Sequence, residues 1–204
     1  MLSIIDAHSR FLYTEIIECD EETNESAIYI NSNLYKLLKF NTINIPAAKR
    51  LKRQTMKTEY YFVGTEVFGM DRYVLKEYHD SQTLNQTQKA FNYRQNRVRL
   101  CGKMAFDLLF YRFKIFERFE QIDKSTVRLI IKTCCMLHNY LTQFLDQPFS
   151  HDDYGNNIDE SEKICIPLAM QFFEKHEDCS QTIENIGNYC VNEGDIPEHW
   201  RKIL

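Results

Sequence analysis

Long apolar runs, a signal peptide and metal-ligand spacings are all missing from this chain of 204 residues. No run approaches the roughly 20 consecutive apolar residues of a membrane-spanning helix, so none is predicted. The N-terminus lacks the basic region and small-residue cleavage site of a signal peptide, so no leader is expected. The histidines are scattered without HxxxH-type spacing, which argues against a histidine metal site.

Disulfide motifs are missing as well. The seven cysteines include no CxxC pair, and an odd number is a poor basis for a disulfide framework. Cys134 and Cys135 fall within an apolar helical pattern. We therefore expect reduced, mostly buried thiols in an intracellular protein.

The composition that is present indicates one folded domain. Hydrophobic residues make up 44% of the chain and aromatic residues 13%, which is typical of a globular protein. A chain of this length can also bury a substantial core.

Charge is unevenly distributed, although the net formal charge is only −4. Basic residues dominate residues 49–57 and 89–118, and acidic residues dominate 146–204. A basic middle and an acidic tail suit a protein that binds nucleic acid or an acidic partner. A solvated helix face and a polar loop would give the same pattern, so charge alone does not decide.

Hydrophobic periodicity predicts a mixed α/β order of elements. The predicted strands are residues 2–5, 11–17, 60–63 and 73–76, with a loop at 41–57. The predicted helices are residues 26–39, 88–119 with a bend near Gly102, 126–145 and 166–177, followed by an irregular end.

The helix at 126–145 has the clearest amphipathic pattern, with Ser125 as the expected N-cap. We expect its buried stripe to be Val127, Ile130, Ile131, Cys134, Leu137, Leu141 and Leu145. His138 lies near this stripe and is expected to be a hydrogen-bonded structural residue.

Five ordered segments resemble the DDE endonuclease domain of PIF/Harbinger transposases and the nucleases domesticated from them. They are MLSIIDAHSRFLY at the start, YYFVGTEVFGM (60–70), FNYRQNRVRLCGKMAFDLLFYRFKIF (91–116), CCMLHNYL (134–141) and NYCVNEGDIPEHW (188–200). The resemblance implies an RNase H-like mixed sheet, here incomplete, with long helices in the C-terminal half. It implies a DDE-type domain at 1–145 and an acidic, partly helical extension of the same domain at 146–204.

The catalytic carboxylates of that family are replaced here. The resemblance places an aspartate after the glycine that ends one strand and a glutamate on the long helix; these positions hold Thr65 and Lys103. Carboxylates are needed because two divalent ions clamp the attacking and leaving oxygens of a phosphodiester. Threonine carries no charge, and a lysine ammonium repels a cation. We expect no intact catalytic residue and no metal, although Mg²⁺ or Mn²⁺ would serve a retained activity.

Two neighbouring acids could rescue the site. Glu66 adjoins Thr65 but points to the opposite face of an extended segment. Asp107 lies one helical turn, or ~6 Å, beyond Lys103 and could equally form a salt bridge with it.

The resemblance also implies a missing first strand, which carries the first catalytic aspartate in the family. The sequence opens at what resembles the second strand, so either the gene model is truncated or the protein lacks that strand. We expect strands 2–5 and 60–63 to pair directly or to flank a gap.

These observations leave open several functions. The first is a degenerate, domesticated protein that acts as a nuclear binding or scaffold module, with a cytoplasmic pool possible. The resemblance implies a Myb/SANT-like DNA-binding protein as partner, and DNA is a second candidate. The expected contacts are Lys49, Arg50, Lys52, Arg53, Lys57, Arg94, Arg97 and Arg99. The rivals are a divalent-metal-dependent DNA endonuclease whose first aspartate lies upstream, and a decaying transposon copy.

Overall fold

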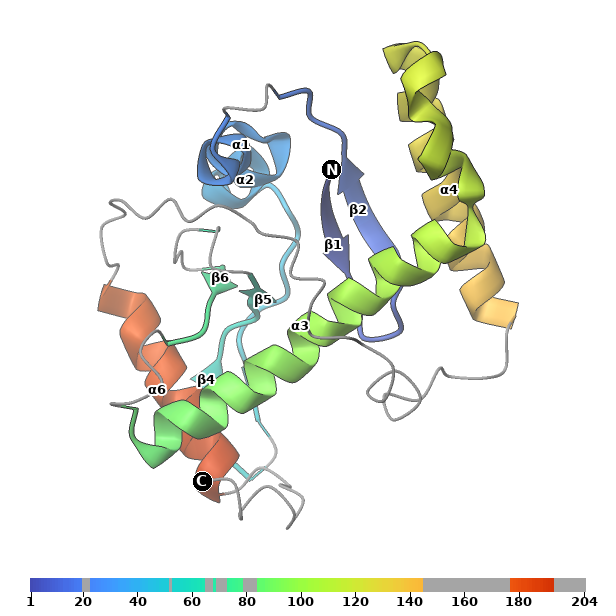
Figure 1. Cartoon of the computed structure of the whole chain (residues 1–204). Coiled ribbons are helices and arrows are strands. Elements are labelled where there is room, and N and C mark those ends of the chain that lie inside the picture. Colours follow the sequence, from blue (N-terminus) through green and yellow to red (C-terminus); the bar gives the residue numbers. More distant parts are fainter. Residues whose placement is uncertain are drawn as a thin grey trace. The chain divides into compact units, whose positions relative to one another are not determined.

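The computed structural model describes residues 1–19, 23–51, 53–64, 68, 73–78, 84–144 and 177–192. Figure 1 shows its helices and strands. The chain divides into two compact units. Unit 1 comprises residues 1–17 and 101–168, and unit 2 comprises residues 18–100 and 169–204. Small sheets and long helices confirm the predicted mixed α/β class. No helix in the described ranges is long and apolar enough to cross a membrane.

Unit 1 opens with an antiparallel hairpin of β1 (Leu2–Ile5) and β2 (Phe11–Glu15), as predicted. The register steps from Tyr13 to Phe11 between Ile4 and Ile5, so Leu12 is the extra residue of a β-bulge. Leu12 is 64% exposed, whereas Phe11 is buried. The bulge therefore lets Phe11 join the core without burying its neighbour.

The turn between these strands is built on Asp6. Its Oδ1 accepts the backbone N–H groups of His8 and Arg10, and its Oδ2 accepts Nε of Arg10 at 2.7 Å. Ser9 has φ 59°, a left-handed conformation that the turn requires. Burial alone would raise the pKa of Asp6, but the hydrogen bonds from Arg10 and His8 lower it. Asp6 is therefore a turn residue.

The long helix α3 (Gln86–Arg112) contributes residues to both units and is continuous through Gly102. The bend near Gly102 stays a prediction, and it does not interrupt the helix. A Cβ added there would meet no atom within 4 Å, so this glycine lies on an open helix surface. The helix instead ends before Phe113, which has φ −116° and ψ 87°, and the 3₁₀ helix η1 (Lys114–Gln121) follows.

Helix α4 (Lys124–Phe144) confirms the clearest helix prediction. Its N-cap is Asp123 rather than Ser125, because Oδ1 of Asp123 accepts the N–H of Thr126 at 3.0 Å. Ile131, Cys134, Cys135 and His138 are buried on it.

The core of unit 1 joins these elements. Its buried residues come from β2, α3 and α4, and further phenylalanines from η1 pack against them. The buried members are Phe11, Ala105, Leu109, Ile131, Cys134 and Cys135.

Unit 2 begins with two short helices where one was predicted. They are α1 (Glu25–Asn31) and α2 (Asn33–Lys39). Ser32 separates them because its backbone is extended, with ψ 155°, and its Oγ accepts the N–H of Tyr35 as the N-cap of α2. A serine that can cap a new helix competes with helix continuation.

Two small sheets follow in unit 2. β3 (Lys49–Arg50) and β4 (Lys57–Thr58) form an antiparallel hairpin within the predicted loop. β5 (Phe62–Val63) pairs in parallel with β6 (Val74–Leu75). Among the described strands β1 pairs with β2 alone, so of the two expected arrangements of residues 2–5 and 60–63 the direct pairing is not found.

Helix α6 (Glu177–Asn192) occupies a stretch that was expected to be irregular. Ile183, Ile186 and Cys190 are buried on it, at a spacing that repeats every turn. They form the core of unit 2 with Leu75, Ala90 and Phe91. The predicted helix 166–177 lies outside the described residues except for Glu177.

Candidate functional site

The strand that leads to position 65 is fixed by backbone contacts. The N–H of Phe62 donates to Tyr73 O at 2.7 Å, and the N–H of Gly64 donates to Leu75 O at 2.9 Å. A Cβ on Gly64 would lie 2.7 Å from Cγ1 of Val74, so the pairing with β6 requires glycine there. Thr65 and Glu66 follow directly and lie outside the described residues.

The second position, Lys103, lies on α3 in unit 1 and is exposed. Asp107 lies one turn further along the same helix and is half-buried. An ammonium group cannot ligate a divalent cation and repels one at close range. The side chain at position 103 therefore does not fit the metal that DDE chemistry uses. Within the described residues no three His, Cys, Asp or Glu side chains form a metal cluster.

Four of the basic residues that were expected to contact a partner lie on the β3–β4 hairpin. Lys49, Arg50, Arg53 and Lys57 are all exposed there, and we call these four residues the basic hairpin. Lys52 lies outside the described residues.

Two features of the basic hairpin are energetically unfavourable when no ligand is bound to it. Arg50 lies directly opposite Lys57, and like charges in opposed positions destabilise a hairpin. Arg53 has φ 66°, a conformation that an arginine rarely adopts. An anion bound here would relieve the first of these costs.

The arginines of α3 are not arranged as one surface. Arg97 and Arg99 are exposed. Helix positions i and i+2 are ~200° apart around the axis, so these two side chains point to opposite sides. Arg99 also lies 3.7 Å from Glu77 and donates to Asn96. Arg94 is half-buried, and its charge partly offsets the burial that raises the pKa of Cys190.

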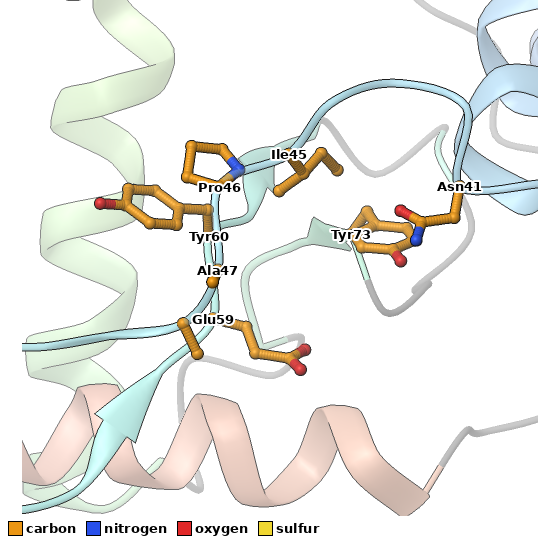
Figure 2. A pocket seen from close by; sticks show the side chains of 8 residues that line it. Asn41, Ile45, Pro46, Ala47, Glu59, Tyr60 and Tyr73 are labelled. Carbon is orange, nitrogen blue, oxygen red and sulfur yellow. The ribbon is translucent and has the colours of Figure 1, made fainter.

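A small cavity of about 170 Å³ flanks the basic hairpin (Figure 2). Its walls come from the segment before β3 and the segment after β4, and it is smaller than the ~300–1,000 Å³ of typical ligand pockets. The lining residues are Asn41, Ile45, Pro46, Ala47, Ala48, Glu59, Tyr60 and Tyr73. The rings of Tyr60 and Tyr73 do not point toward each other (Figure 2), so they do not form a cage.

His138 is a structural residue, as predicted. It is fully buried, and its Nε2 lies 2.8 Å from Ser9 O while its Nδ1 lies 3.1 Å from Nη1 of Arg112. Its neighbour Asn139 accepts the N–H of Phe11 and donates to Phe11 O, both at 2.8 Å. Both ring nitrogens are thus used, which leaves none to ligate a metal.

Five cysteines in the described part of the chain are free thiols: Cys19, Cys101, Cys134, Cys135 and Cys190, of which the last three are buried. Burial raises the pKa of all three, which makes them poor nucleophiles. The prediction of mostly buried thiols is confirmed for these residues, while Cys19 is exposed.

Sequence reasoning missed a second apolar stripe on α4. Leu137 and Leu141 were expected to be buried, but they are 46% and 39% exposed. They belong with four other exposed residues to a surface that we call the α4 apolar face: Leu129, Met136, Leu137, Tyr140, Leu141 and Phe144. The i, i+7, i+11, i+15 spacing of Leu129, Met136, Tyr140 and Phe144 was the available signal.

Comparison with known proteins places the chain in a family. The model of the DDE superfamily endonuclease family matches residues 18–139. A protein named "Protein ALP1-like" from Arabidopsis thaliana is 28% identical over 151 residues, which cover 71% of this chain and 35% of that protein. The chain thus spans about a third of the length of this curated relative. No solved structure matches. The family match covers more than half of the sequence, and the chain belongs to the DDE superfamily endonuclease family.

Proposed function

We propose that this chain is a catalytically degenerate, Harbinger transposase-derived protein that acts as a nuclear binding or scaffold module. Its membership of the DDE family supplies the starting activity, which is hydrolysis of DNA phosphodiesters with divalent ions. The observation that carries the loss of that activity is Lys103, an exposed ammonium group where the resemblance expects a metal-binding glutamate. A positively charged side chain repels a divalent metal ion, so it opposes metal binding more strongly than a neutral side chain would.

The proposed architecture is an incomplete RNase H-like fold. The order of an antiparallel hairpin, short helices, a strand ending at Gly64 and the long helix α3 supports it. By resemblance, positions 65 and 103 correspond to two carboxylate positions of the family, and neither of them holds a carboxylate here.

The proposed binding activity rests on the basic hairpin. Four exposed cations on one short hairpin, two of them directly opposed, favour contact with phosphate groups or an acidic protein surface. The resemblance further suggests a Myb/SANT-like protein as partner and the nucleus as location, with a cytoplasmic pool. Imaging of a tagged chain, and binding to such a protein, would test these two points.

A metal-dependent DNA endonuclease is the second candidate. Asp107 favours it, because a half-buried carboxylate lies one turn from Lys103 on the same helix. The relative is also much longer than this chain, so further carboxylates can lie in residues beyond this sequence.

Metal titration distinguishes the two candidates without relying on activity. The natural chain and the variant Thr65→Asp/Lys103→Glu would be titrated with Mn²⁺ by calorimetry, with Thr65→Asn/Lys103→Gln as a control that supplies no carboxylate. We expect binding only in the carboxylate variant. Binding of Mn²⁺ by the natural chain, lost in Asp107→Asn, would support the endonuclease instead.

A further inference from the structure

The α4 apolar face is exposed to an extent that is unusual for large apolar residues. Leu129 is 67% exposed, Met136 65%, Tyr140 60% and Phe144 62%. Single exposed apolar residues are normal on protein surfaces, but contiguous ones mark interaction sites. Met136, Tyr140 and Phe144 follow one another at four-residue spacings on neighbouring turns, and Leu129 lies two turns before Met136 on the same side of the helix.

The part of this face formed by Leu129, Met136 and Tyr140 lies on the opposite side of α4 from the core of unit 1. At 100° per residue, Leu129, Met136 and Tyr140 fall within ~40° of one another, and His138 lies ~180° from Leu129. Ile131, Cys134 and His138 are buried on the side of α4 that packs against β2 and α3, and no described residue covers Leu129, Met136 and Tyr140 on the other side. From Leu129 to Phe144 the face is ~22 Å long, which matches about four turns of a partner helix.

The charges of α4 indicate what such a helix must carry. α4 has three basic side chains, Lys124, Arg128 and Lys132, and no acidic one. Lys132 is exposed and lies one turn from both Leu129 and Met136, so it borders the face directly. A partner with acidic residues beside its apolar stripe would complement this border.

We propose that the α4 apolar face is the docking site for an acidic amphipathic helix of a partner protein. The apolar stripe of that helix would pack on Leu129, Met136 and Tyr140, and a glutamate or aspartate on its flank would pair with Lys132. The inference deepens the proposed binding role by naming a surface and the chemistry of its ligand.

A second copy of this chain fits the face less well. If two α4 helices packed together, each would carry basic side chains and no acidic one. The apolar contact would then have no ion pairs beside it. Met136 and Tyr140 also offer large, adaptable contacts of the kind that are enriched in interfaces with other proteins.

Peptide binding to the full chain tests the proposal. The probe is a synthetic 18-residue peptide with leucines at heptad positions and glutamates on both flanks, and its partner probe has lysines in place of the glutamates. Fluorescence anisotropy should show at least tenfold tighter binding of the glutamate peptide. Leu129→Ser/Tyr140→Ser should weaken that binding at least tenfold, whereas Leu12→Ser, which alters a similarly exposed leucine on the β-bulge, should not.

Charge exchange provides the sharper control. Lys132→Glu should weaken binding of the glutamate peptide and strengthen binding of the lysine peptide. A merely structural role of Lys132 would not produce this exchange. Equal binding of both peptides, or of neither, would overturn the proposal. So would a dimer that Leu129→Ser/Tyr140→Ser abolishes, or cross-linking of a photoreactive residue at position 136 to residues 145–176 of the same chain. The readout is binding, so its failure leaves the question of nuclease activity untouched.

Discussion

Arg112 donates a hydrogen bond to Nδ1 of the buried His138, at 3.1 Å, and thereby fixes the histidine as a neutral imidazole. A guanidinium group can only donate, so Nδ1 must accept and the ring proton must lie on Nε2, which donates to Ser9 O at 2.8 Å. Burial lowers the pKa of His138, the bond to Ser9 opposes this, and the charge of Arg112 lowers it further.

This relationship predicts that the chain loses stability in mild acid. As pH falls through 6.5 the unfolded histidine takes up a proton before the folded one does, so unfolding becomes more favourable. The free energy of unfolding should fall by up to about 1.4 kcal/mol per pH unit between 6.5 and the lowered folded value, and the contribution is fully present above that window. Urea denaturation from pH 7 to 5 would measure the slope.

His138→Asn should remove this slope and lower stability at pH 7 by about 1–3 kcal/mol, because buried polar partners lose their hydrogen bonds. His8→Asn, at an exposed turn position, is the matched control and should leave both quantities nearly unchanged. A wild-type slope that survives in His138→Asn would show that another group titrates.

The glycines of two helices should respond oppositely to alanine. Gly102→Ala should stabilise the chain by about 0.5–1 kcal/mol, because the helix gains propensity and the new Cβ meets nothing within 4 Å. Gly187→Ala should destabilise it, because the new Cβ would lie 2.7 Å from Cγ2 of Thr87. Thermal melts of the two variants would give shifts of opposite sign; equal shifts would contradict the packing of α6 on α3.

The basic hairpin should show a conflict between stability and binding. Arg50→Glu converts a repulsive pair with Lys57 into an attractive one and should stabilise the hairpin by about 0.2–1 kcal/mol. The same change should weaken DNA binding, because one phosphate contact becomes a repulsion. Chemical denaturation and binding of a labelled duplex, run on one variant, would reveal both effects. A loss of stability together with unchanged DNA binding would contradict the role of this pair.

DNA binding should also depend steeply on salt. Arg50→Glu/Lys57→Glu should reduce the slope of log affinity against log salt by about 2, since each phosphate contact contributes about 0.9. The control Lys36→Glu/Lys39→Glu changes the net charge equally on the exposed end of α2 and should leave the slope unchanged. Equal slopes in both double variants would mean that net charge, and not the hairpin, attracts DNA.

The sequence predicted those elements whose local pattern and tertiary environment agree. β1, β6 and α4 carry dense apolar residues at the period of their own structure, and they form as expected. His138 was assigned correctly because a lone histidine on an apolar helix face usually needs buried partners. The partners themselves, Arg112 and Ser9, lie 26 and 129 residues away and could not be read from local pattern.

The failures have separate physical causes. One helix was expected where Ser32 caps a second one, because a serine inside an apolar period does not show whether its Oγ will turn to the backbone. Helix α6 was missed because its buried positions are few and Gly187 interrupts them. On α4 only one apolar stripe was predicted, with Leu137 and Leu141 in it, although the helix carries two and only one of them faces the core of unit 1.

Nicking of supercoiled plasmid DNA tests the central claim most directly. The purified chain would be incubated with Mg²⁺ or Mn²⁺, with and without a chelator, beside Asp107→Asn. We predict no metal-dependent conversion to the open-circular form, because the resemblance places Lys103, with its positive charge, where the family has a metal-binding glutamate. Reproducible nicking that the chelator abolishes, and that Asp107→Asn removes, would contradict the claim and identify a rebuilt endonuclease.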